Sequence, residues 1–463
     1  MQGQTVNLSN IFSILNQSSG TSNSTILNLQ NSLQTANSNI SQLTNQYSSL
    51  NTNLQNNTTN INNQIDSILS TLNSQAYLNE TNVVMVEKFG AKGNGSADDS
   101  AAFNDAAQYL ESRGGGTILA TQVYYIGSNI NLPSFVDIRG HFNSAMTRYN
   151  TGTFISSASC LIINPNAYIS GGSTSGLYGL LCFQSEFPTN GNSTTTPSFQ
   201  GVAFQVGSSS SSQGFVNSYA SNCGFIGFNM GVATYNTGRV IVDNLTTLCN
   251  TAVQITSCYD IARVNRVHQN FYIWNNDWSH PEGPFIYING GESSWQHITN
   301  CFTYGSIQGF VENNSGNNVY TNCGCDGNFP AAGGPSGLGG AFIRNGKDYG
   351  PGMYIGCQTT GNFGFVTNTD SYTSTPPWPQ MQVIGGQGWG PSTSNAFLAY
   401  PYNWIDANGF LLQSGGMAPG VIESNAYFTA IGGTPLNFGN QAGTYTQMYL
   451  SPGSTNWTVN TNA

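Results

Sequence analysis

Apolar positions in the first 79 residues recur with alternating steps of three and four, the spacing of a coiled-coil seam. They are Ile26, Leu29, Leu33, Ala36, Ile40, Leu43, Tyr47, Leu50, Leu54, Thr58, Ile61, Ile65, Ile68, Leu72 and Ala76, with Thr58 the one polar member. Two successive steps of four interrupt the pattern and locally unwind a supercoil. The outer positions are mostly Asn, Ser and Thr, which are weak helix formers, so the helix must associate with other copies in order to persist. The resulting coiled coil can have two, three or four strands. We predict a polar coiled-coil stalk over residues 1–79, with a disordered tether as the alternative.

The pattern changes at residue 83. The segment VVMVEKF predicts a strand, and the glycines that follow it predict a turn. Asp98 or Asp99 can then cap a helix that carries its apolar positions on one face and stops at Arg113, before three glycines. Residues 117–126 alternate as a β-branched and aromatic strand. Residues 80–126 are therefore predicted to form a strand and helix capping element.

From residue 127 to about Tyr400 the helical period disappears, and short apolar runs alternate with Gly, Asn and Ser, as in proteins with many short strands. Cysteine is followed by glycine four positions later at Cys223, Cys301, Cys323 and Cys357, and the first three of these cysteines follow an asparagine. A period near 22 residues is typical of solenoids. We predict a β-solenoid over residues 127–375. The Trp- and Pro-rich remainder, 376–463, is predicted to be a cap or a small β domain that covers the last sheet edge.

Charge is scarce in the chain. Its 463 residues include 10 Lys and Arg and 20 Asp and Glu, which gives a net charge of −10. Nucleic acid is an unlikely class of partner because phosphate binding requires clustered cations. Membrane insertion is not expected either, since no apolar run approaches the roughly 20 residues of a spanning helix. The surface must instead consist of amides and hydroxyls, which suits hydrogen bonding to sugars; adaptation to an acidic or salty medium is the alternative.

Nine cysteines, an odd number, lie in the middle of the chain. Buried free thiols explain this count better than a disulfide framework does. The segment MQGQTVNLSNIF lacks the cationic and apolar regions of a secretory signal. We therefore expect folding in a reducing cytosol, with export by lysis or another non-Sec route, or after removal of a leader.

Residues 84–126 resemble the opening segment of the pectate-lyase-like superfamily, as it occurs in phage tailspikes and secreted polysaccharide-degrading proteins. The matching motifs are FGAKGNG at residues 89–95, ADDS at 97–100 with the alanines that follow, and GGGTI at 114–118. Asn94 replaces the usual aspartate, and LATQ at 119–122 replaces a proline-proline-glycine turn. The resemblance implies a right-handed parallel β-helix and, with a coiled coil in front, a tailspike-like homotrimer. It implies no catalytic site, and Asp98 and Asp99 are expected to be caps.

The charged residues gather in one part of the chain, between Asp260 and His297, together with three of the seven tryptophans. Glycan cleavage requires two carboxylates that flank the bond, and flat rings that stack on sugar faces. The catalytic candidates are Asp260, Asp277, Glu282 and Glu292, and the substrate-binding candidates are Arg263, Arg266, Trp274, Trp278, His280 and Trp295. The loop at 274–284 is favoured for substrate contact because binding residues collect on loops.

Each candidate has a structural alternative. Asp260 can form a lateral ion pair with Arg263 or Arg266, and His268 and His297 can be structural. If the site lies between subunits, three further carboxylates are eligible, namely Asp243, Glu312 and Asp326. We expect no cofactor. The spacing of the cysteines and histidines provides no set of zinc ligands, and the sequence contains no glycine-rich phosphate loop. For calcium, the chain offers only scattered oxygen ligands.

The sequence therefore favours a virion tailspike or fibre that is made in the host cytoplasm, attaches to a tail or other virion protein at its N-terminus, and recognises a cell-surface polysaccharide. Whether it also cleaves that polysaccharide, as a depolymerase of the hydrolase or lyase type, stays open. One alternative is a secreted polysaccharide lyase or hydrolase, although the few cations disfavour acidic substrates such as pectate. The other is a structural or adhesive fibre without turnover.

Overall fold

The computed structural model describes residues 13, 23–72, 82–142, 159–188, 198–210, 214–270, 283–290, 293–328, 340–345, 350–361, 363–368, 379–389, 395–399, 403–412, 418–422, 427–431 and 448–450. The chain divides into two units, Met1–Thr81 and Asn82–Ala463. Each unit is described by itself.

Residues 23–72 of the first unit form one long helix, α2 (Asn23–Leu72), of 50 residues. Its apolar positions lie exposed along the single chain; Leu43 and Leu50, for example, are 63% and 67% exposed. Several threonine hydroxyls donate to the carbonyl four residues earlier, among them Thr44 to Ile40 at 2.8 Å. The helix predicted from the apolar spacing is confirmed, and its pairing with other copies stays a prediction.

The second unit begins with β1 (Val83–Met85), a 3-10 turn η1 (Val86–Phe89) and β2 (Asn94–Asp98). The strand predicted for VVMVEKF is therefore too long. Val86 is buried and Gly90 adopts a positive φ of 98°, which turns the chain after the short strand.

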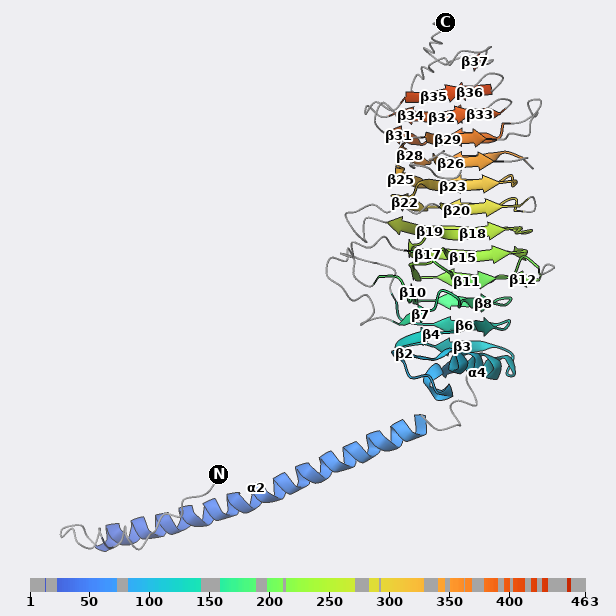
Figure 1. Cartoon of the computed structure of the whole chain (residues 1–463). Helices are drawn as coiled ribbons and strands as arrows, with labels where there is room; N and C mark the ends of the chain where they lie inside the picture. Colours follow the sequence, from blue (N-terminus) through green and yellow to red (C-terminus); the bar gives the residue numbers. More distant parts are fainter. Residues whose placement is uncertain are drawn as a thin grey trace. The chain divides into compact units, whose positions relative to one another are not determined.

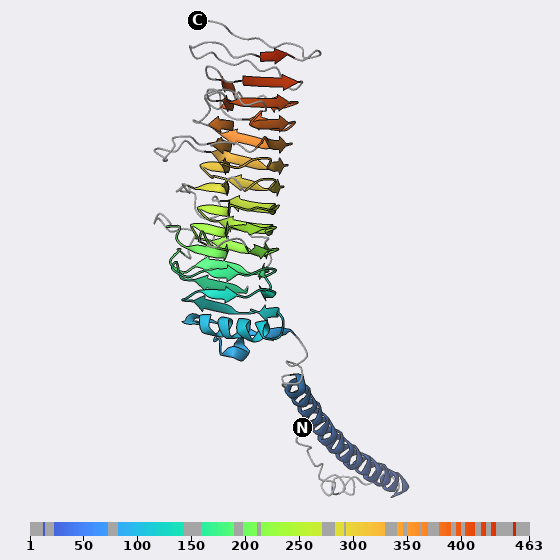
Figure 2. The same ribbon diagram turned by 90° about the vertical axis from the view of Figure 1, so that its right-hand side faces the viewer.

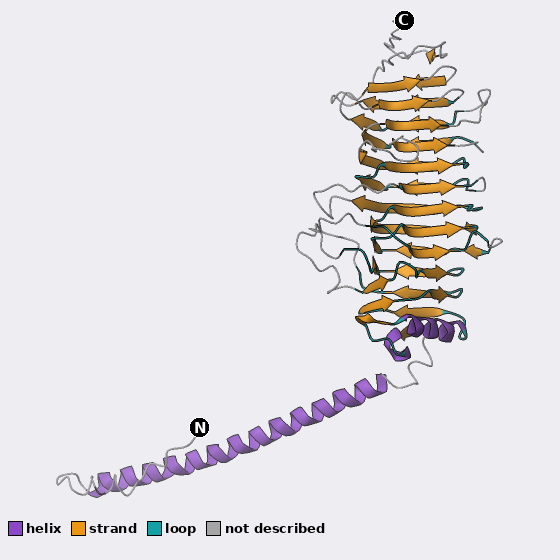
Figure 3. Ribbon diagram, in the orientation of Figure 1, coloured by secondary structure: helices purple, strands orange, loops and turns teal. Residues whose placement is uncertain are grey.

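Helix α4 (Ser100–Glu111) follows and lies across one end of the second unit (Figures 1 and 3). The cap prediction holds for Asp98, whose Oδ1 accepts the backbone N–H of Ser100 at 3.0 Å. Asp99 has another role: its carboxylate accepts the N–H groups of Lys92 and Gly93, at 2.6 and 3.2 Å. The buried face of the helix consists of Ala102, Phe103, Ala106, Ala107 and Leu110.

The other described strands form three ladders, in which every described pairing is parallel; we call them together the stack (Figures 1 and 2). Ladder I consists of β1, β3 (Gly116–Leu119), β6 (Val136–Arg139), β9 (Gly176–Tyr178), β13 (Tyr219–Ser221), β17 (Ile241–Leu248), β19 (Arg263–Asn270), β21 (His297–Thr299), β24 (Val319–Thr321), β27 (Gly352–Ile355), β30 (Met381–Ile384), β33 (Trp404–Asn408), β36 (Tyr427–Ile431) and β37 (Met448–Leu450).

Ladder II consists of β2, β4 (Val123–Ile126), β7 (Cys160–Ile163), β10 (Leu181–Gln184), β14 (Gly224–Ile226), β22 (Phe302–Tyr304), β25 (Gly324–Asn328), β28 (Gln358–Gly361), β31 (Gln387–Trp389) and β34 (Leu411–Leu412). The long strands β17 and β19 belong to ladders I and II together. The single strand predicted over 117–126 is thus two strands, β3 and β4, on different ladders.

Ladder III consists of β5 (Ile130–Leu132), β8 (Ile169–Gly171), β11 (Val202–Val206), β15 (Met230–Tyr235), β18 (Thr251–Thr256), β20 (Pro284–Asn289), β23 (Gln308–Asn313), β26 (Gly340–Asn345), β29 (Phe363–Asn368), β32 (Asn395–Ala399) and β35 (Ala418–Ile422). A short pair, β12 (Phe215–Val216) with β16 (Thr237–Gly238), lies beside the ladders. The strands described after residue 376 continue the same three ladders.

Like residues stack inside the ladders. Phe310, Phe342 and Phe365 are register partners on ladder III, with ring centroids 4.8 and 5.0 Å apart. This spacing matches the distance between neighbouring strands, so each ring lies flat on the next. All nine cysteines are buried and free, as predicted. Burial raises the pKa of the Cys223 and Cys249 thiols to about 12.

The asparagines that precede cysteines lie at the corner between ladders I and II. Asn222, Asn300 and Asn322 adopt left-handed φ values of 51 to 53°, and Gly356 takes this place on the next rung. Asparagine and glycine tolerate this conformation better than other residues do. The Asn-Cys recurrence in the sequence is therefore a corner residue followed by the first inward side chain of the next strand.

Candidate functional site

Ladder I presents an outward surface on which charged and aromatic side chains gather. On strands β6 to β21, alternate residues such as Ile138, Val242 and Ile298 point inward and are buried. The residues between them form two outward columns across the rungs. We call this surface the ladder I face, and its polar, charged and aromatic residues on those strands are Asp137, Arg139, Tyr178, Tyr219, Ser221, Asp243, Arg263, Asn265, His297 and Thr299.

A first group on this face surrounds Asp137. Arg139 contacts the carboxylate through Nη2 and Nε, at 2.8 and 3.1 Å from Oδ2, and the Tyr219 hydroxyl donates to the same oxygen. Burial, reinforced by the hydrogen bond to Asp137, raises the pKa of Tyr219 above its usual range. The guanidinium also lies 5.7 Å from the ring centroid of Tyr178, which is 41% exposed. Aspartate, arginine and tyrosine therefore hold one another in place across three strands.

A second group surrounds Asp243. Arg266 binds its carboxylate with both Nη2 and Nε, at 2.6 and 3.2 Å, and Asn265 donates to it at 2.8 Å. The Asn265 amide oxygen in turn accepts from Thr299 and Asn300 on the next rung, at 2.9 and 3.2 Å. Arg266 has a φ of 54° and occupies the corner that neighbouring rungs fill with asparagine. The backbone thus holds its guanidinium at the edge of the face.

A third group lies where the chain enters ladder I. Arg239 contacts Asp260 at 3.0 Å between Nε and Oδ2. Arg263 and His297 are direct register partners on β19 and β21, and both are exposed. Trp295, two residues before β21, is 60% exposed and has a φ of 65°. A large ring thus lies uncovered in the single chain beside two hydrogen-bonding side chains.

The structure brings together four of the predicted site residues. Asp260, Arg263, Arg266 and Trp295 all lie on the ladder I face or at its corners. The ion pair suggested between Asp260 and Arg263 or Arg266 is wrong, because Asp260 binds Arg239 and Arg266 binds Asp243. The other six candidates lie outside the described residues: Trp274, Asp277, Trp278, His280, Glu282 and Glu292. Five of them fall within residues 271–282 and Glu292 within residues 291–292, with the described strand β20 between the two stretches.

Three other carboxylates were eligible for a site between subunits. Asp243 lies on the ladder I face, as described above. Asp326 lies on ladder II and accepts from the Thr360 hydroxyl at 2.7 Å. Glu312 is 1% exposed inside the stack, so it cannot reach a polysaccharide on the outer surface.

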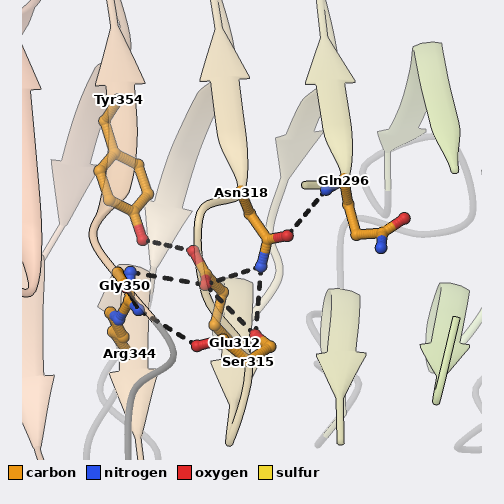
Figure 4. Close-up of polar contacts among 7 residues, drawn as sticks. All are labelled: Gln296, Glu312, Ser315, Asn318, Arg344, Gly350 and Tyr354. Atoms are coloured by element: carbon orange, nitrogen blue, oxygen red, sulfur yellow. Dashed lines mark hydrogen bonds and ion pairs between the residues drawn. The ribbon is translucent and has the colours of Figure 1, made fainter. Parts of the chain in front are cut away.

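Glu312 belongs instead to a buried polar cluster between ladders III and I (Figure 4). Tyr354 and Asn318 donate to its carboxylate at 2.8 and 2.9 Å, and Arg344 Nη1 lies 3.7 Å from Oε2. Arg344 also donates to the carbonyls of Ser315, at 3.1 Å, and Gly350. Burial and the charge of Glu312 raise the pKa of Tyr354 well above its usual range. The cluster joins three strands of the interior, β23, β26 and β27, and the residue that precedes β24.

Sequence reasoning missed the group around Asp137. A signal was present, since Asp137 and Arg139 are two apart in a strand and therefore share a face. Tyr178 and Tyr219 lie about 40 and 80 residues further on, so only the rung lengths could have aligned them with Asp137. The local density of charge, which guided the prediction, does not detect residues assembled from separate rungs.

The charged groups of the ladder I face are paired. Within the part of it that the structure describes, Asp137, Asp243 and Asp260 each contact an arginine. No cluster of three metal-ligating side chains occurs among the described residues, and none of the described helices is long and apolar enough to span a membrane.

The three parallel ladders, coiled one rung upon the next, define the second unit as a parallel β-helix. No family model and no curated protein matches the chain. Solved structures with a similar fold include the Dettilon tailspike protein, at a TM-score of 0.45 and 13% identity over 79% of this chain and 68% of that one. Others are a GH87 α-1,3-glucanase from Streptomyces thermodiastaticus (TM-score 0.44, 13% identity, 81% and 69% covered) and an exopolygalacturonase from Thermotoga maritima (0.41, 13%, 79% and 90%). The strand ladders themselves, rather than these similarities, carry the fold assignment.

Proposed function

We propose that this chain is a virion tailspike or fibre whose ladder I face binds a host cell-surface polysaccharide. The observation that carries the proposal is the composition of that face: exposed rings of Trp295 and Tyr178, the amide of Asn265 and paired arginines, all on the ladder I strands or directly beside them. Planar rings stack on the apolar faces of sugars, and amides and guanidinium groups donate to their hydroxyls. A rigid scaffold lowers the entropy lost on binding.

The other parts of the chain fit this role. The exposed apolar seam of α2 suits association into a homotrimer, with the N-terminal region attached to a tail or other virion protein. Nine buried free thiols suit folding in the reducing cytoplasm of a host cell before release. A secreted polysaccharide lyase or hydrolase is the alternative setting for the same β-helix.

Binding without turnover is the second candidate, and one observation favours it. Each described carboxylate on the ladder I face is already engaged by an arginine, so none of them stands alone at the surface. A depolymerase activity therefore depends on carboxylates outside the described residues, of which Asp277, Glu282 and Glu292 are the candidates. Replacing Asp277 and Glu282 with their amides abolishes cleavage if that loop is catalytic.

The test is binding of the purified full chain to capsular polysaccharide and lipopolysaccharide from bacterial strains, together with an assay for new reducing ends or unsaturated sugars. Trp295→Ala is expected to weaken binding about tenfold, a loss of about 1.4 kcal/mol, because the ring that stacks on the sugar is removed. Leu411→Ala is the control, because Leu411 is 52% exposed on ladder II, away from the face. Undiminished binding by Trp295→Ala contradicts the assignment of the site, and no binding to any polysaccharide contradicts the function.

A further inference from the structure

Three arginines on the outer surface of the β-helix each form an ion pair with an aspartate. Arg139 binds Asp137 at 2.8 Å, Arg239 binds Asp260 at 3.0 Å and Arg266 binds Asp243 at 2.6 Å. Each of these arginines is about half exposed, so each pair lies at the surface and could have been left to solvent. In a chain of net charge −10, acidic partners for cations are in excess.

Arg263 is the exception. It is exposed at the start of β19, and it forms no ion pair with any carboxylate of the described residues. The two nearest carboxylates along the face, Asp243 and Asp260, are bound to Arg266 and Arg239 instead. The guanidinium of Arg263 is thus exposed to solvent without an acidic partner among the described residues.

The neighbours of Arg263 do not neutralise it either. In register below it on β17 is Ile241, which is 39% exposed, and in register above it on β21 is His297. A second group that can carry positive charge therefore lies on the next strand, about 4.8 Å away along the ladder. Trp295 is two residues before His297 and exposes its ring at the adjacent corner. A cation, an imidazole and an indole thus surround one uncovered patch.

We propose that this patch reads an acidic sugar, with Arg263 and His297 binding the sugar carboxylate and the Trp295 ring stacking on an adjacent sugar. The inference rests on the proposed function and adds the class of glycan. A guanidinium matches a carboxylate with two parallel N–H donors, which makes the contact both strong and directional. Arg263 is then the residue that distinguishes an acidic repeat unit from its neutral counterpart.

The experiment uses the full chain and a panel of polygalacturonate, hyaluronan, alginate, polysialic acid and capsular polysaccharides that contain uronic acids. Each is paired with its carboxyl-reduced form, in which the carboxylate has become a primary alcohol. Binding is measured for the unmodified chain, for Arg263→Gln, for Arg263→Lys and for Arg113→Gln. Arg113 is the matched control, since it is an arginine that follows α4 and lies over the Tyr109 ring, away from the ladder I face.

We expect the unmodified chain to bind at least one acidic member about tenfold more tightly than its reduced form, a difference of about 1.4 kcal/mol. Arg263→Gln should remove this preference for the acidic polysaccharide and leave the affinity for the reduced form unchanged. Arg263→Lys should retain part of the preference, and Arg113→Gln should retain all of it. The inference is overturned if Arg263→Gln still binds the acidic form more tightly than the reduced form. It is also overturned if the unmodified chain binds only neutral and reduced polysaccharides. In either case the proposed function stands. Failure to bind any member overturns both.

Discussion

Glu312 and Arg344 place two opposite charges inside the β-helix, where neither is more than 1% exposed. Taking a charge out of water costs several kcal/mol, which attraction and hydrogen bonds must offset. Here Tyr354, Asn318 and Ser315 supply hydrogen bonds to the carboxylate. Each charge is therefore tolerated only while the other is present.

Replacing Glu312 with glutamine should strongly destabilise the β-helix. The Arg344 cation would then lie buried without its counter-charge, at a cost of about 3–5 kcal/mol. Urea unfolding followed by circular dichroism measures the change. The control is Arg239→Gln, which breaks a surface pair in which both side chains are more than 40% exposed and should cost at most about 1 kcal/mol. If both variants lose the same free energy of unfolding, burial of the Glu312–Arg344 pair has no energetic consequence.

At the scale of single elements, α2 cannot derive its stability from its own sequence. Its side chains are mostly polar, with weak helix propensity, and apolar side chains such as Leu43, Tyr47 and Leu50 are exposed in the single chain. Long isolated helices of this composition are marginal in water. Burial of the seam between copies of the chain would stabilise the helix despite its weak propensity and would remove the apolar side chains from water.

Sedimentation of the full chain should therefore give a trimer, and the double variant Leu43→Asn, Leu50→Asn should dissociate it or lower the temperature at which the helix melts. Ser41→Asn with Ser48→Asn is the control, since these exposed residues lie outside the seam, also seven apart, and change no apolar contact. A monomer in the unmodified protein, or a trimer indifferent to the seam variant, would contradict the coiled coil.

The elements could be predicted where a single period governs many residues, as in α2, or where a cap and glycines mark both ends, as in α4. Prediction failed for VVMVEKF and for residues 117–126, because a β-helix turns after three or four residues. Those turns occur at corners such as residues 120–122, whose sequence carries neither Gly nor Pro. Local charge density selected Arg263 and Trp295 as binding candidates, but it left His297 among the structural histidines. The ion pairing of this region depends on which rungs are adjacent, and rung length varies along the chain.

At the scale of the whole molecule, three of the buried thiols, Cys160, Cys223 and Cys249, make stability depend on pH. Burial raises the pKa of Cys160, Cys223 and Cys249 from 9.0 to about 12. In the unfolded chain these thiols lose protons from about pH 9, whereas in the folded chain they keep them up to about pH 12. Unfolding therefore releases protons in this window, and the free energy of unfolding falls as the pH rises through it, by about 1.4 kcal/mol per pH unit for each thiol.

Urea midpoints measured between pH 7 and pH 10 should accordingly be level up to about pH 8 and then decline. Cys249→Ala separates the thiols from other groups that ionise in the same range: its midpoint is lower at neutral pH because of the cavity, but its decline with pH should be shallower. Parallel declines in the two proteins would mean that Cys249 titrates alike in both states.

Every described strand of the ladders forms its backbone pairs only with strands one turn before or one turn after it, and the interior columns of phenylalanine and cysteine repeat from turn to turn. Insertion or loss of one complete coil therefore preserves the pairing on either side of it. Recombination between related genes could exchange the coils that carry Asp243, Arg263 and Trp295 for others of equal length. Such an exchange would alter the surface proposed to bind a polysaccharide while the architecture persists.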